Sequence, residues 1–74
     1  MKEIESLLSV LAKNIRTRRH AAGLTQEGLA ERAELHRTYI ADVERAARNI
    51  SILNVARIAR ALGVSVSVLC TGMK

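Results

Sequence analysis

Cysteine, histidine and aromatic residues are scarce in this sequence. Cys70 is the only cysteine, so the chain cannot close an internal disulfide. His20 and His36 are the only histidines, and so few soft ligands argue against a structural zinc site or another metal centre. No apolar run approaches the roughly 20 residues of a membrane-spanning helix, and the acids near the N-terminus are not typical of a signal peptide. We therefore expect a cytoplasmic protein without membrane contacts, metal or cofactor.

What the sequence does contain is a short, basic and apolar chain. Its 74 residues suit one small domain, and 49% of them are apolar, which is enough for a compact core. Twelve Lys and Arg against seven Asp and Glu give a net charge of +5. A positive balance of this kind favours a polyanionic partner, and nucleic acid is the usual one.

The apolar pattern is helical almost throughout. It predicts helices at residues 4–22, 25–33, 36–45, 52–62 and 65–70, with N-caps at Thr25, Ser51 and Ser65. The alternating residues 64–68 would also suit a strand, but no partner strand is evident. The side chains expected to face inward from the first and fourth helices are Ile4, Leu7, Leu8, Leu11, Ile15, Ala22, Ile52, Val55, Ile58, Ala59 and Leu62. We expect an all-α, five-helix compact domain over residues 1–74.

Two of these helices, at residues 25–33 and 36–45, are joined by a tight turn. Ala30 provides the small side chain that two steeply crossing helices need at their contact, and Leu35, Ile40 and Val43 are spaced to pack against it. Such a unit presents its second helix as a ridge that fits a DNA major groove about 12 Å wide. The sequence therefore predicts a helix-turn-helix at the centre of the domain.

The segment TQEGLAERAELHRTYIADVE, residues 25–44, resembles the Cro/C1-type helix-turn-helix of phage repressors, and the closing LGVSVSVL also matches that family. The run LHRTYIADVER followed by ARNIS is similar to the controller proteins of restriction–modification systems. Glu34 and Ala46 stand where the family commonly has glycine or asparagine, so a left-handed backbone is expected at both positions.

This resemblance implies a homodimeric transcription regulator that binds operators upstream of its own gene and of an endonuclease gene, with both activation and repression. A phage-type repressor or an antitoxin with the same domain is the nearest alternative. A protein-interaction module that does not bind DNA is a more distant one. An enzyme is not expected, because no Ser/His/Asp set, paired buried carboxylates, phosphate loop or metal spacing is present.

Three residues on the outer side of the helix at 36–45 are candidates for base contact. Arg37 can grip the O6 and N7 atoms of guanine with two hydrogen bonds, and Thr38 can reach a base edge or a phosphate. Asp42 could accept a hydrogen bond from cytosine N4, or it could hold Arg37 or Arg45 in place. For Arg37 and Thr38 the alternative is an ordinary solvated side chain.

Further residues are candidates for the DNA backbone. Gln26 heads a helix, where backbone amides and the helix dipole favour phosphate, and the resemblance assigns a phosphate contact there. The resemblance places a second phosphate clamp at Arg48, Asn49 and Ser51, and a phosphate or groove contact at Tyr39. His36 could also reach a phosphate. The family further places a buried ion pair where Arg19 and Glu44 stand, and we expect its role to be structural.

Two protein–protein surfaces are also expected. A dimer would place two recognition helices about 34 Å apart, and it would add apolar burial to a small core. The residues assigned to the symmetric interface are Leu53, Arg57, Val64, Val66, Val68 and Leu69. In resembling activators a patch at the positions of Glu27 and Glu31 contacts the sigma subunit of RNA polymerase; the alternative is ordinary solvation.

Overall fold

The computed structural model describes residues 2–73, with side chains from residue 6 onward. These residues form five helices. They are α1 (Lys2–Ala21), α2 (Gln26–Ala33), α3 (Arg37–Glu44), α4 (Ile52–Leu62) and α5 (Val66–Leu69). No strand is present among these residues, so the all-α prediction is confirmed and the strand alternative at residues 64–68 is wrong. The predicted helix boundaries are met to within two residues.

Polar side chains begin the four helices that follow α1. The Thr25 hydroxyl accepts from the Gly28 backbone N–H at 2.9 Å, and Ser51 and Ser65 act in the same way for α4 and α5. These three caps are as predicted. His36 is an unpredicted cap: its Nδ1 accepts from the Thr38 backbone N–H at 3.3 Å and so begins α3. Each cap satisfies a backbone donor that the helix itself leaves without a partner.

The core lies where α1 and α4 cover the helix-turn-helix. The apolar core cluster consists of Leu11, Ile15, Leu29, Ala30, Ala33, Ile40, Val43, Val55, Ile58, Ala59 and Leu69. Ala30 is 3% exposed and Ile40 is 0% exposed, so the small residue and its partner pack in the core as the helix-turn-helix pattern predicts.

Two of the side chains expected to face inward do not. Ile52 is 71% exposed, because it is the first residue of α4 and lies at the rim of an open apolar pocket rather than inside the core. Ala22 is also exposed, because α1 ends at Ala21 and the chain turns there. The side chain of Ile4 lies outside the described residues.

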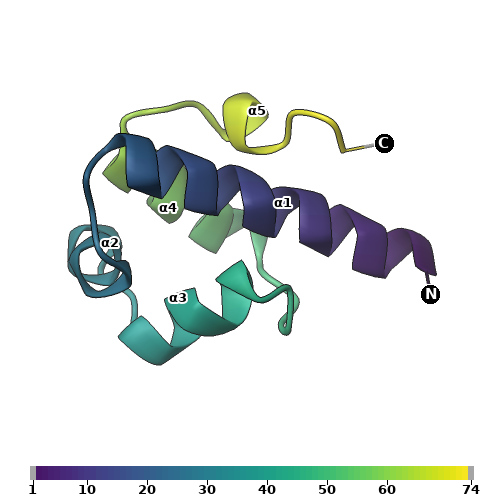
Figure 1. Cartoon of the computed structure of the whole chain (residues 1–74), viewed down its shortest axis with the longest axis horizontal. Helices are drawn as coiled ribbons and strands as arrows, with labels where there is room; N and C mark the ends of the chain where they lie inside the picture. Colours follow the sequence, from purple (N-terminus) through teal and green to yellow (C-terminus); the bar gives the residue numbers. More distant parts are fainter. Residues whose placement is uncertain (1, 74) are drawn as a thin grey trace.

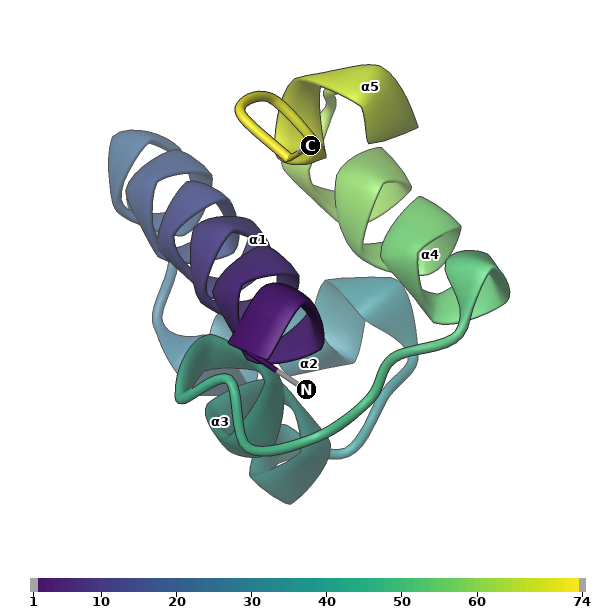
Figure 2. The ribbon, with the colours of Figure 1, turned by 90° about the vertical axis from the view of Figure 1, so that its right-hand side faces the viewer.

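Helix α3 lies at one edge of the molecule and α5 at the opposite edge, with α1 between them (Figure 1). Figure 2 shows the same separation after a quarter turn, with α1 and α4 side by side. Asn14 fastens α5 to α1, since its Nδ2 donates to the Leu69 carbonyl at 2.7 Å and to the Thr71 carbonyl at 2.8 Å. This arrangement leaves the outer side of α3 open to a partner. None of the described helices is long and apolar enough to cross a membrane.

Glu34 and Ala46 adopt the left-handed conformation expected of them, with φ of 57° and 58°. Glu34 caps the C-terminal end of α2, where its N–H donates to the carbonyls of Ala30 and Glu31, and Ala46 follows Arg45, the cap of α3. A side chain in this conformation costs roughly 1–2 kcal/mol. The two turns that shape the helix-turn-helix therefore carry backbone strain.

We expect Ala46→Gly to raise the free energy of unfolding by about 1 kcal/mol, because glycine adopts positive φ without this cost. The matched control is Ala47→Gly, since Ala47 is exposed and has no positive φ. That change should lower stability by roughly 0.4–1 kcal/mol through the added freedom of the unfolded chain. Urea unfolding of both variants measures the difference, and an equal loss in the two would contradict strain at Ala46.

Candidate nucleic-acid interface

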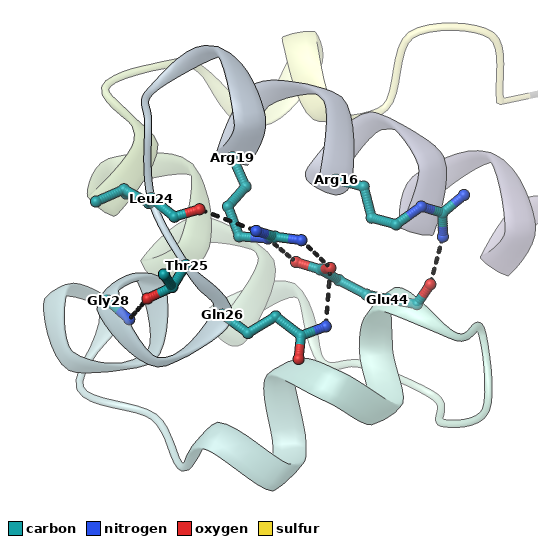
Figure 3. A network of polar contacts seen from close by, with 7 residues as sticks. All are labelled: Arg16, Arg19, Leu24, Thr25, Gln26, Gly28 and Glu44. Carbon is teal, nitrogen blue, oxygen red and sulfur yellow. Dashed lines mark hydrogen bonds and ion pairs between the residues drawn. The ribbon is translucent and has the colours of Figure 1, made fainter.

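A buried ion pair joins α1 to α3 (Figure 3). Arg19 Nε donates to Glu44 Oε2 at 2.7 Å, and Arg19 Nη2 donates to Glu44 Oε1 at 3.0 Å. The two side chains are 11% and 2% exposed. Arg19 Nη1 also donates to the Leu24 carbonyl at 2.9 Å, so the guanidinium reaches the connection to α2 as well. The predicted internal pair is confirmed.

Two further side chains bind Glu44 in ways that sequence reasoning missed. Arg16 is not among the residues singled out in the sequence, yet its Nη1 donates to the Glu44 backbone carbonyl. That carbonyl is at the C-terminal end of α3, where acceptors lack helical partners and a cation is favoured. Arg16 lies three residues before Arg19 on α1, and this spacing is the signal that could have placed both on one face.

Gln26 is the second of these side chains. Its Nε2 donates to Glu44 Oε1 at 3.1 Å, and its amide oxygen points away from Glu44 (Figure 3). An amide nitrogen carries two N–H donors. Glu44 accepts one of them, which leaves the other for an anion at the start of α2. The candidate phosphate residue is thus oriented by the buried ion pair.

An open polar cavity of about 390 Å³ lies at the N-terminal end of α2. Arg19, Thr25, Gln26, Glu27 and Arg37 line it. It brings the candidate phosphate residue Gln26 and the candidate base-reading residue Arg37 to one hollow. The first-turn amides of α2 and the guanidinium of Arg37 favour an anion there, whereas the carboxylate of Glu27 opposes one. The hollow has the chemistry to accept a phosphate beside a groove-binding helix.

The outer side of α3 is open at its start and engaged at its end. Arg37 and Thr38 are exposed, as base readout requires. Asp42 is hydrogen-bonded to Arg45 and not to Arg37, and its Oδ2 lies 3.5 Å from Arg48 Nη2. Of the two alternatives foreseen for Asp42, the structure shows an arginine-holding contact.

Tyr39 connects α3 to α4 instead of pointing freely outward. Its hydroxyl accepts from Asn54 Nδ2 at 3.0 Å, and its ring is half-buried. The Arg48 guanidinium lies over this ring, 5.0 Å from the centroid, which is a cation–π geometry. The hydroxyl still has its own hydrogen to donate. Asn54 was not a predicted site residue, because nothing in the sequence pairs it with Tyr39.

The remaining candidates are exposed or half-buried, with one exception. Asn49 and Ser51 are exposed beside Arg48, and His36 is exposed at the start of α3. Leu53 is 61% exposed, Arg57 is exposed, and Val64, Val66 and Val68 are half-buried. Leu69 is 0% exposed and belongs to the protomer's own core, so the expectation that it offers surface to a second copy is wrong. Glu27 and Glu31 are exposed on α2.

The polar residues of this surface are not arranged as a metal site. Within the part of the chain that the structure describes, no three His, Cys, Asp or Glu side chains gather closely enough to hold a metal ion. The surface offers arginines, amides and a helix N-terminus, which are ligands for phosphate and base edges. An exposed second helix with this chemistry defines a helix-turn-helix DNA-binding protein.

Comparison with known proteins agrees with this class. The family model named Helix-turn-helix matches residues 15–69. The chain is 47% identical to the control protein C.SmaI of Serratia marcescens over 84% of this chain and 74% of that protein. The crystal structure of the restriction–modification controller protein C.AhdI from Aeromonas hydrophila is 39% identical, covers 84% of this chain and 94% of that chain, and superposes with a TM-score of 0.82.

A third relative has been solved with DNA. The controller protein C.Esp1396I, crystallised as a tetramer in complex with its natural 35-base-pair operator, is 41% identical over 85% of this chain and 83% of that chain, with a TM-score of 0.80. The chain therefore belongs to the helix-turn-helix family, among the controller proteins of restriction–modification systems. The resemblance expected from residues 25–51 is confirmed, and these relatives are regulators rather than enzymes.

Removing one partner of the buried pair should be costly. We expect Glu44→Ala to lower the free energy of unfolding by about 3–5 kcal/mol, because Arg19 then stays buried without its partner. The double variant Arg19→Met with Glu44→Leu should lose less than Glu44→Ala alone, since no unpaired charge remains. Guanidinium unfolding measures both. A loss under about 1 kcal/mol for Glu44→Ala, the range of exposed pairs, would contradict this account.

Proposed function

We propose that the protein is a homodimeric transcription regulator that binds operators upstream of its own gene and of an endonuclease gene in a restriction–modification system. The hollow shared by Gln26 and Arg37 supports this proposal most directly, because it joins a phosphate-binding helix terminus to an exposed recognition helix. The operator complex of the similar C.Esp1396I also supports it. Such a regulator acts in the cytoplasm, associated with the nucleoid when bound. One domain over residues 1–74 would serve both DNA binding and dimerisation.

Contacts to bases and contacts to the backbone are assigned to different residues. Arg37 and Thr38 are exposed at the start of α3, the end of a recognition helix that meets base edges. Gln26 is assigned to a phosphate on one side of α3, through the N–H that Glu44 leaves unused. We assign the phosphates on the other side to the connection that follows α3. The residues assigned there are Arg48, Asn49 and Ser51.

Tyr39 and His36 take part in a more limited way. Tyr39 can donate its remaining hydroxyl hydrogen to a phosphate while Asn54 holds its oxygen. His36 already accepts from the Thr38 N–H, so only its other ring nitrogen is available to the DNA. Asp42 is not retained for base readout, because its carboxylate is taken up by Arg45 and Arg48.

We place the dimer interface on the exposed side of α4 and the turn into α5. Leu53 and Arg57 are exposed one turn apart on α4, and Val64 and Val66 are half-buried beyond it. Ile52, 71% exposed, extends this apolar surface. A chain of 74 residues gains stability from such burial, since a core of this size rarely supplies more than about 3–5 kcal/mol.

Glu27 and Glu31 remain the candidate contact for the sigma subunit of RNA polymerase. Both are exposed on α2, one helical turn apart, so they can meet a partner that approaches beside the DNA. Glu27 also lines the hollow proposed for phosphate, and its carboxylate must therefore turn outward when DNA is bound.

A DNase footprint on the DNA upstream of this gene tests the proposed function. We expect paired protected half-sites, about 34 Å from centre to centre within a dimer site, that fill cooperatively as protein is added. Two protomers on a two-fold axis produce this pattern because each half-site takes one α3. Diffuse protection that disappears with modest salt would contradict operator binding and leave only non-specific basic attraction.

Arg37 and Arg48 should differ in how their loss acts. We expect Arg37→Ala to cost about 1–3 kcal/mol of operator binding and to relax the preference at one base pair. Arg48→Ala should weaken operator and unrelated DNA alike and reduce the slope of log K against log salt by about one. The control Arg18→Ala removes an exposed arginine near Val68, at the α5 side of the molecule, and should change neither. Fluorescence anisotropy with operator variants measures all three, and identical patterns for Arg37 and Arg48 would contradict the division.

A further inference from the structure

An exposed cluster of opposite charges closes the end of α3. Asp42 accepts from Arg45 Nη2, and Arg48 Nη2 lies 3.5 Å from its other carboxylate oxygen. The Asp42 side chain is 19% exposed, whereas those of Arg45 and Arg48 are 69% and 49% exposed. We call these three residues the Asp42 cluster. Its carboxylate lies beneath two guanidinium groups that still face solvent.

Arg48 has a second support that does not involve charge neutralisation. Its guanidinium lies over the Tyr39 ring, and the Tyr39 hydroxyl is fixed by Asn54 on α4. This contact does not involve the carboxylate, so we expect it to keep Arg48 near α3 without Asp42. What Asp42 adds to the cluster is therefore mainly one negative charge.

We propose that Asp42 is a specificity-determining residue that suppresses binding to DNA other than the operator by partly neutralising Arg45 and Arg48. This inference rests on the proposed function, in which α3 and the connection after it face DNA. It concerns a residue that contacts the arginines rather than the bases. The chemistry of the partner is double-stranded DNA, recognised here through its phosphates.

The physical basis is that the loose complex with non-specific DNA and the close complex with the operator use the Asp42 cluster differently. Non-specific binding depends on the net positive potential and on counterion release. In that loose complex the carboxylate of Asp42 subtracts one charge and gains nothing in return. In a close complex each guanidinium, with five N–H donors, can give some to Asp42 and others to phosphate. The penalty from Asp42 therefore falls mainly on DNA that α3 does not fit.

The test compares Asp42→Asn with Glu34→Gln in the full chain. Both changes remove one negative charge, and the Glu34 side chain is exposed in the turn between α2 and α3, with no ion pair among the described residues. Binding to the footprinted operator and to a scrambled duplex of equal length is measured by anisotropy from about 50 to 200 mM salt. Urea unfolding of each variant confirms that the fold is intact.

We expect Asp42→Asn to tighten binding to the scrambled duplex severalfold and to steepen its salt slope by about one. Operator affinity should change less, so the ratio of the two affinities falls; in Glu34→Gln that ratio should stay as in the original protein. Equal tightening on both DNAs in the two variants would overturn the proposal, because it would reflect net charge alone.

Weaker operator binding with an unchanged scrambled duplex would also overturn it, and would assign Asp42 to base readout or to positioning of the arginines. These results leave the proposed function standing. If the unaltered protein shows no preference for the operator, the proposed function fails, and the proposal fails with it.

Discussion

The carboxylate of Glu44 is the point on which the rest of the structure depends. It lies at the end of α3 and accepts hydrogen bonds from Arg19 Nε and Nη2 on α1 and from Gln26 Nε2 in the first turn of α2. Arg19 then extends to the Leu24 carbonyl in the connection between α1 and α2. One buried acid thus sets the relative positions of three helices. The candidate phosphate donor of α2 and the candidate base-reading start of α3 are held to one another through it.

Apolar packing alone would not fix this arrangement so closely. Ala30 and Ile40 let α2 and α3 approach, but a contact between a methyl group and a branched side chain tolerates small rotations. Hydrogen bonds with a bidentate guanidinium do not, because their geometry is directional. The left-handed residues Glu34 and Ala46 then set where α3 begins and where it stops. Burial brings the helices together, and polar contacts and turns determine how they face the DNA.

Much of this fold could be predicted from the sequence, because local signals agreed with one another. Apolar steps of three and four and hydroxyl caps each act within a few residues, so five helices could be predicted from them. The pairing of Arg19 with Glu44 was accessible only through the resemblance, since 25 residues separate them. Position along the chain misled in three places: Ile52 and Ala22 are exposed although their spacing suits the core, and Leu69 is buried although it was assigned to a dimer surface.

Contacts between distant side chains were the least predictable part of the site. The Gln26–Glu44 and Tyr39–Asn54 hydrogen bonds join different helices, and neither spacing nor residue type indicates them. The Asp42 cluster is more local, and the pairing of Asp42 with Arg45 was one of the predicted alternatives. Whether Asp42 pairs with an arginine or stays free for cytosine depends on the path of residues 45–48. That path is set by a strained turn at Ala46.

The molecule uses the same ion-pair chemistry for two purposes, and burial separates them. Glu44 is 2% exposed and its partner Arg19 is 11% exposed, so separating the two would leave a buried charge without its partner. Asp42 holds arginines that are 49% and 69% exposed, in contacts that water and salt already weaken. A phosphate can therefore replace or share those arginines at little cost. The inner pair keeps the recognition unit rigid, and the outer pairs leave its charge adjustable where the DNA arrives.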